Sequence, residues 1–178
     1  SSAEEIADNI FINFEELNCV TNVSDAFRRT APIVRENLKN NICFDWELGN
    51  KLETENNINN SKYNISIELI NNRLIPNPME CRSTIGNYNY EKDQFTLYCS
   101  SQGVHSLRRK LSNIFNITEE KLHVITKDVG GGFGMKIFNY PEYVLTLAAA
   151  KIVKRPVKWR ASRTESFLSD IHGRDHLS

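Results

Sequence analysis

The sequence predicts an α+β fold in which mixed sheets pack against helices. Two strand-like runs on either side of a polar turn at 91–93 predict a β-hairpin over 83–100. Apolar residues at helical spacing predict a helix over 104–115, and a run of small residues predicts another over 143–153. Strands that alternate with such helices exclude a helical bundle, and the chain has no internal repeat.

Two further strands are predicted in the second half of the chain. Residues 122–125 are an apolar strand that leads into a glycine-rich run, and residues 155–159 begin the other strand. Pro141 suits the first turn of the helix that lies between them, because proline lacks the N–H that a first turn leaves unused.

The first seventy residues carry weaker patterns. A helix is predicted over 3–10, a strand over 11–17 and a short helix over 24–28. Residues 54–64 are predicted to be a surface loop or a short helix. The alternation of apolar and polar residues over 63–69 has a period of two, which predicts a half-buried strand.

Composition excludes several classes of function. The 178 residues are 40% apolar and 25% charged, as in a globular protein of one domain, or one domain and part of another. The net charge is zero and the basic residues are dispersed, so nucleic-acid binding has no electrostatic support. No apolar run approaches a membrane span and no signal peptide is evident, so we expect a cytoplasmic protein. Both ends lack a terminating element, and we expect a piece of a longer chain.

Residues 130–134, Gly-Gly-Gly-Phe-Gly, are the most unusual segment. Each glycine costs backbone entropy and offers no side chain to pack, so helix or strand preference does not explain the run. We interpret it as a shaped loop whose main chain approaches a ligand, with Phe133 as an aromatic wall. The alternative is a tight turn between a strand and a helix, and the sequence leaves it open.

This run does not match the common phosphate-binding motifs. A Walker loop requires Ser or Thr after its lysine, and Ile137 occupies that place. A Rossmann fingerprint requires a third glycine where this chain has Met135.

Polar side chains at the end of the hairpin form a second candidate. Ser100, Ser101 and Gln102 stand where a strand ends and a helix begins, a frequent position for functional groups. The alternative is a simple helix cap by one serine, with the glutamine in solvent. Nearby, Glu80 and Arg82 are interpreted as members of an intramolecular ion pair in preference to site groups.

Protein-ligated metal has little support in the sequence. The four cysteines are far apart and are expected to be free thiols. His172, Asp175 and His176 suggest a metal site, but no glutamate follows His172, and Gly173 opposes the helix that would align the two imidazoles. We therefore expect no metal held by protein side chains.

Several motifs in order resemble one family. They are residues 72–82, the Ser-Gln pair at 101–102, residues 128–136, residues 155–159, and residues 163–176. Over nearly its whole length the chain resembles the molybdopterin-binding large subunit of the xanthine dehydrogenase/aldehyde oxidase family, nearest to members of the carbon monoxide dehydrogenase large-chain type. The resemblance implies that residues 1–46 are the C-terminal part of an α/β hammerhead domain plus a linker. Residues 47–178 would then be the N-terminal part of the molybdopterin-binding domain.

The resemblance also implies roles for particular residues. Gln102 would lie beside the apical oxo ligand of molybdenum and act in catalysis, because an amide can polarise that unit without adding charge. Gly131, Gly132, Phe133 and Gly134 would contact the cofactor, and Phe133 would line the substrate channel. In the family the metal is held by the pterin dithiolene, so no protein ligand is needed.

The activity implied is that of a molybdenum hydroxylase, which oxidises carbon monoxide or hydroxylates an aldehyde or an N-heterocycle with water as the oxygen source. The cofactor would be the molybdenum–molybdopterin cofactor in its cytosine dinucleotide form. FAD and iron–sulfur clusters would lie on medium and small partner subunits.

One departure and one gap restrict this interpretation. Ile137 stands where purine-oxidising members have an acidic residue, which argues against a purine substrate. The family's general-base glutamate and active-site cysteine loop lie beyond this segment, so we expect the chain alone to be inactive. A non-catalytic assembly module of the same family and an unrelated nucleotide-binding domain are the alternatives.

Overall fold

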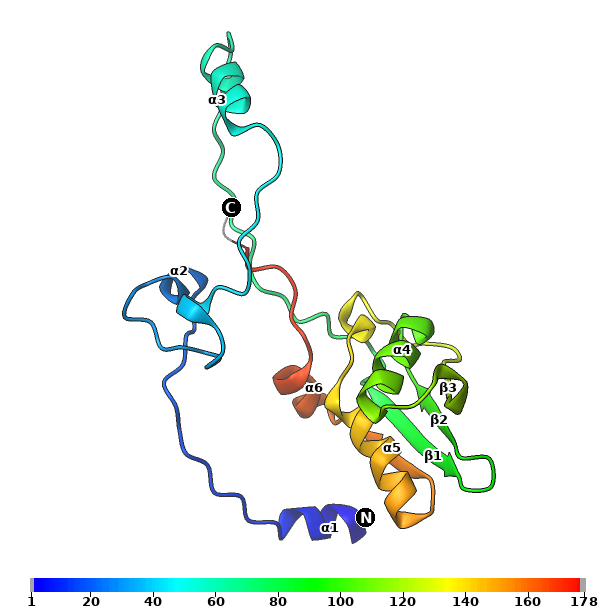
Figure 1. Cartoon of the computed structure of the whole chain (residues 1–178). Helices are drawn as coiled ribbons and strands as arrows, with labels where there is room; N and C mark the ends of the chain where they lie inside the picture. Colours follow the sequence, from blue (N-terminus) through cyan, green and yellow to red (C-terminus); the bar gives the residue numbers. More distant parts are fainter. Residues whose placement is uncertain (1, 177–178) are drawn as a thin grey trace. The chain divides into compact units, whose positions relative to one another are not determined.

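The computed structural model describes residues 2–176, which divide into two units (Figure 1). The first consists of residues 2–70 with residue 176, and the second of residues 71–175. All described strands belong to the second unit. The expected division at residues 46 and 47 stays a prediction.

The second unit is built on a four-stranded mixed sheet. Its strands are β1 (Ser83–Asn89), β2 (Gln94–Cys99), β3 (Leu122–Ile125) and β4 (Val157–Arg160), in the order β3-β2-β1-β4. β1 runs antiparallel to β2 and β4, whereas β2 and β3 are parallel. The predicted hairpin and both later strands are confirmed, and so is the α+β class.

Two helices cover one face of this sheet. α4 (Val104–Phe115) connects β2 to β3, and α5 (Pro141–Val153) begins at Pro141, as predicted. The inward residues of β2 follow the period of two, and they share one core with residues of α4 and α5. The core consists of Phe95, Leu97, Cys99, Leu107, Leu111, Leu122, Val124, Met135, Tyr140, Tyr143 and Leu147.

Three shorter elements complete the second unit. η2 (Glu119–Lys121) leads into β3, η3 (Met135–Ile137) follows the glycine run, and α6 (Arg163–Ser169) follows β4. α6 begins with a capping box between Ser162 and Glu165. The main-chain N–H of Gln102, after β2, donates to the carbonyl of Lys136 in η3, so the end of β2 lies beside the glycine run.

The first unit contains α1 (Ser2–Asp8), α2 (Val23–Ala26), η1 (Lys39–Asn41) and α3 (Lys51–Asn59). The helices predicted near 3–10 and 24–28 are confirmed, and the short-helix alternative holds for part of 54–64. The strands predicted over 11–17 and 63–69 are wrong, because neither segment forms a strand. The apolar Ile65 and Leu69 are 90% and 78% exposed. A strand needs a hydrogen-bonded neighbour, and the described residues provide none for either segment.

No described side chain of this unit is buried. Among residues 2–176, no helix is long and apolar enough to cross a membrane.

Close contact between β1 and α5 depends on Gly86. A Cβ at this position would lie 2.5 Å from the carbonyl carbon of Thr146, which is main chain and cannot rotate away. We predict that Gly86→Ala lowers the stability of the second unit by about 1–3 kcal/mol through overpacking. Thermal unfolding measures this loss. Gly173→Ala is the control, because a Cβ there meets nothing within 4 Å, and its effect should stay within about 0.5 kcal/mol. Equal midpoints for the two variants would refute the packing argument.

Candidate functional site

Gln102 is held on the glycine run by three hydrogen bonds. Its main-chain N–H donates to the carbonyl of Lys136 at 3.1 Å. Its side-chain Oε1 accepts from the N–H groups of Gly134 and Lys136, at 3.0 and 3.2 Å. Because both partners are donors, the amide oxygen must face the loop. The Nε2 group is therefore turned away from the loop, and within residues 2–176 it donates no hydrogen bond.

The glycines of the run serve different purposes. A Cβ on Gly132 would lie 2.5 Å from Cδ of Gln102, so only glycine leaves room for the seated amide. Gly131 and Gly134 have φ of +94° and +86°, a region that other residues rarely adopt. The run is thus a tight turn, as the alternative proposed, but one shaped around the Gln102 side chain.

Phe133, between these glycines, borders a hollow. Its φ is +50° and the residue is 72% exposed. With Gly134 it lines a hollow of about 270 Å³ whose surface is mainly apolar. The other lining residues are Pro76, Met135, Phe138, Ile171, His172 and Gly173. The structure therefore places the loop, Gln102 and a hollow at one end of the sheet.

Of the two serines in the β2–α4 connection, Ser101 binds main chain and Ser100 donates to the Glu80 carboxylate. Ser101 Oγ accepts from the N–H of Gly103 at 3.1 Å and lies 3.4 Å from the carbonyl oxygen of Lys136. The N-cap of α4 is Gly103 and has no side-chain cap. The alternative of a serine helix cap is therefore wrong. Gln102 is exposed, as the same alternative expected, but its amide oxygen is bound by the loop.

Glu80 holds the glycine run through a second set of hydrogen bonds, separate from those of Gln102. Its Oε2 accepts from Lys136 Nζ at 2.8 Å, from Ser100 Oγ at 2.7 Å and from the Gly130 N–H at 2.9 Å. Burial raises the pKa of this carboxyl, but the bonds from Lys136, Ser100 and Gly130 outweigh burial and hold the pKa below its ordinary value. The Lys136 side chain is completely buried, so this carboxylate is its counter-charge.

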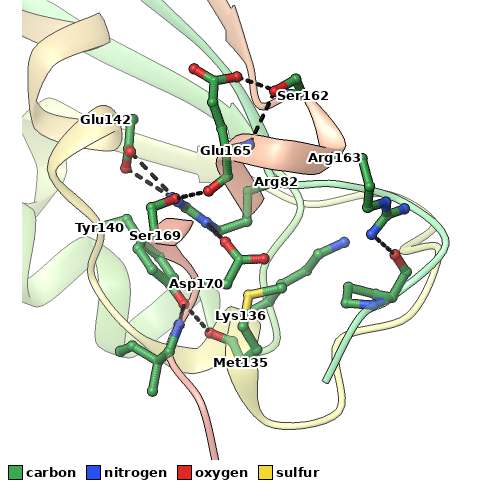
Figure 2. A network of polar contacts seen from close by, with 12 residues as sticks. Arg82, Met135, Lys136, Tyr140, Glu142, Ser162, Arg163, Glu165, Ser169 and Asp170 are labelled. Carbon is green, nitrogen blue, oxygen red and sulfur yellow. Dashed lines mark hydrogen bonds and ion pairs between the residues drawn. The ribbon is translucent and has the colours of Figure 1, made fainter. Parts of the chain in front are cut away.

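Arg82 forms a second buried ion-pair network (Figure 2). Its Nε donates to Asp170 at 2.6 Å, and its other nitrogens donate to Glu142 at 2.8 Å and to Ser169 at 2.9 Å. The guanidinium also lies 3.6 Å from the centre of the Tyr140 ring. The ion-pair interpretation of Glu80 and Arg82 is confirmed, although each has its own partners. Arg82 thereby fixes the segment after α6 that carries His172 to the hollow.

The C-terminal histidines do not form a metal site in the described structure. Within residues 2–176, no group of three or more His, Cys, Asp or Glu side chains could hold a metal ion. Asp175 pairs instead with Arg73 at 3.1 Å.

Sequence reasoning missed the anchoring roles of Lys136 and Arg163. A lysine between Met135 and Ile137, beside a glycine run, is a weak signal of a buried cation. Arg163 donates to the carbonyls of Pro78 and Met79, at 2.8 and 2.9 Å. No pattern in the sequence indicates those contacts, because they join segments more than eighty residues apart.

The family described as Molybdopterin cofactor-binding domain matches residues 34–178. The chain belongs to this family. The resemblance to molybdopterin-binding large subunits is thus confirmed, and the alternative of an unrelated nucleotide-binding domain is set aside.

Individual relatives agree with this assignment. The carbon monoxide dehydrogenase large chain of Hydrogenophaga pseudoflava is 30% identical over 186 residues, which cover 98% of this chain and 23% of that protein. The reconstituted CO dehydrogenase from Oligotropha carboxidovorans has a TM-score of 0.86 at 28% identity, over 97% of this chain and 23% of that one. Quinoline 2-oxidoreductase from Pseudomonas putida 86 has a TM-score of 0.74 at 26% identity, over 97% and 22%. The chain therefore spans about a quarter of the length of these proteins.

Replacing Gly132 tests how Gln102 is seated. Gly132→Ala should push the Gln102 amide off the loop, because the new Cβ would overlap its Cδ. The N–H groups of Gly134 and Lys136 would lose their acceptor, and their hydrogen exchange should speed up by about tenfold or more. Mass spectrometry of the peptide that contains the loop measures this. Gly103→Ala is the control, since a Cβ there lies 3.5 Å from its nearest neighbour, and unchanged exchange in both variants would contradict the geometry.

The pKa of Glu80 predicts how stability depends on pH. The carboxyl is more acidic in the folded chain than its ordinary value of 4.5, so its contribution is complete above that pH. The contribution is lost as the pH falls below 4.5 through the lower, folded-state pKa. The stability difference between the parent and Glu80→Gln should therefore shrink on acidification from pH 6 to pH 3. Denaturation at several pH values measures it, and a constant difference would refute the assignment.

Proposed function

We propose that this chain is the part of a molybdenum hydroxylase large subunit that presents Gln102 and the glycine loop to the molybdenum–molybdopterin cofactor. One observation carries the proposal. The loop amides bind the oxygen of Gln102, so its Nε2 is an oriented donor with no protein partner in residues 2–176. A donor held in this way is ready for a ligand and needs no reorganisation when the ligand arrives.

The surroundings of Gln102 fit such a cofactor. A Cβ on Gly134 would meet nothing within 4 Å, so the main chain there is accessible to a large planar group. Phe133 and Gly134 border an apolar hollow that offers a substrate access beside the loop. No metal-ligating cluster occurs among the described residues, and a metal held by the pterin needs none.

Each residue has a distinct task in this proposal. Gly131, Gly132, Phe133 and Gly134 contact the cofactor through their main chain, and Phe133 forms a wall of the substrate channel. Gln102 donates a neutral hydrogen bond to the cofactor, which stabilises developing charge without fixing an ion at the site. When bound, the cofactor supplies two-electron redox chemistry.

The relatives suggest the substrate class and the assembly. We propose carbon monoxide, an aldehyde or an N-heterocycle as substrate, with water as the source of oxygen, because carbon monoxide dehydrogenases and quinoline 2-oxidoreductase are among the relatives. Ile137, apolar and half exposed, is consistent with a small uncharged substrate. The cytosine dinucleotide form of the cofactor, a FAD-binding medium subunit and an iron–sulfur small subunit belong to this proposal. So do the cytoplasmic location and the division into a hammerhead tail at 1–46 and a cofactor-binding part at 47–178.

Gln102→Glu tests the donor function of Nε2 separately from the acceptor function of Oε1 toward the loop. A carboxylate keeps an oxygen for the N–H groups of Gly134 and Lys136 but removes the Nε2 donor. In the complete enzyme, we expect Gln102→Glu and Gln102→Ala to retain molybdenum while kcat falls by about a hundredfold. Metal analysis and steady-state kinetics measure the two quantities.

Gln94→Ala is the matched control, since Gln94 lies in β2 and donates only to the carbonyl of Glu120 among described residues. Its kcat should be unchanged. Full turnover in the Gln102 variants would remove the assigned role. A parent protein that binds neither molybdenum nor pterin would favour the non-catalytic assembly module.

A further inference from the structure

We infer that Glu80 and Lys136 form a positioning pair that sets the direction of the Gln102 amide. This inference rests on the proposed function of Gln102. It assigns a role to an ion pair with a buried ammonium and a partly exposed carboxylate, neither of which lines the hollow.

Lys136 joins the pair to Gln102. Its N–H donates to Gln102 Oε1 at 3.2 Å, and its carbonyl accepts from the Gln102 N–H at 3.1 Å. The same residue therefore fixes both the main chain and the side chain of Gln102. Any shift of the Lys136 backbone would move two of the three bonds that orient the amide.

The Lys136 side chain is in turn fixed by Glu80. Its ammonium is completely buried and lies 2.8 Å from Glu80 Oε2. A buried cation without a counter-charge is strongly destabilising, so the ammonium cannot leave Glu80 without a new partner or exposure to water. The charge thus holds Lys136 at one place in the loop.

Glu80 also fixes the start of the loop. It accepts from the Gly130 N–H at 2.9 Å, and its own N–H donates to the Gly130 carbonyl at 3.1 Å. A Cβ on Gly130 would lie 2.6 Å from Cβ of Glu80, so these two segments of the chain are in contact with no room for a side chain at Gly130. Through Gly130 and Lys136, one carboxylate holds the loop on both sides of Gly132.

The two ion pairs with buried cations therefore have different roles. Arg82 with Glu142 stabilises the fold at a place where neither residue contacts the loop by a hydrogen bond in the described structure. Lys136 with Glu80 stabilises the fold and also orients the side-chain amide of Gln102. Both cations are completely buried. Glu142→Gln is therefore a control that removes a carboxylate from a buried cation away from the loop, while Arg82 keeps Asp170 as a counter-charge.

The first measurement is hydrogen exchange in the complete protein. Glu80→Gln and Lys136→Met should speed up exchange of the Gly134 and Lys136 N–H groups by about tenfold, whereas Glu142→Gln should leave these amides unchanged. Unchanged loop exchange in Glu80→Gln, or an equal increase in Glu142→Gln, would overturn the inference. Glu80→Gln keeps the size of the side chain, so the test does not depend on whether Lys136→Met folds.

The second measurement is a double-mutant cycle on kcat in the complete enzyme. If Glu80 acts through Gln102, Glu80→Gln should lower kcat about tenfold in the parent and have no further effect in Gln102→Ala. KM should change little in either background. Additive losses would overturn the inference. Absence of molybdenum from the parent protein would refute the proposed function instead, and the exchange result would still decide whether Glu80 positions Gln102.

Discussion

The buried ammonium of Lys136 is the constraint on which this end of the sheet depends. A cation with no exposure to water must have a counter-charge, and Glu80 supplies it at 2.8 Å. That requirement brings together the segment before β1, the end of β2 and the glycine run, because Ser100 and Gly130 bind the same carboxylate oxygen. Arg82, two residues after Glu80, ties the same segment to α5 and to the residues after α6. Short-range order at the site therefore comes from charge and hydrogen bonding more than from apolar packing.

The glycine run shows how closely one sequence feature can be predicted and where prediction stops. Four glycines in five positions indicated a loop with close main-chain approach, and the structure has that loop. The sequence could not identify what the chain approaches, because Gly132 contacts a side chain thirty positions earlier and Gly130 contacts one fifty positions earlier. Pairings across such distances are set by the topology of the sheet, which local patterns do not encode.

The same reasoning explains which elements were predicted. The strands of the hairpin and α4 carry clear periodicity, and α5 carries a run of small apolar residues. All of them bury one face in the same core, so local pattern and tertiary packing agree there. Residues 63–69 have an equally clear alternation but no partner strand in the described chain, and Ile65 is 90% exposed. Alternation reports only that a segment is suited to a half-buried strand, and it cannot report whether a neighbour is present.

The identity of residue 102 follows from the two demands placed on it. The loop offers two N–H donors, which require an acceptor, and the proposed function requires the opposite side of the amide to remain a donor for a ligand. Glutamate would satisfy only the first demand and lysine only the second, whereas glutamine satisfies both without a net charge. A neutral group also leaves the pKa of Glu80 and the pairing of Lys136 undisturbed at close range. The loop thus selects the chemical nature of the residue, and the ion pair behind the loop selects its direction.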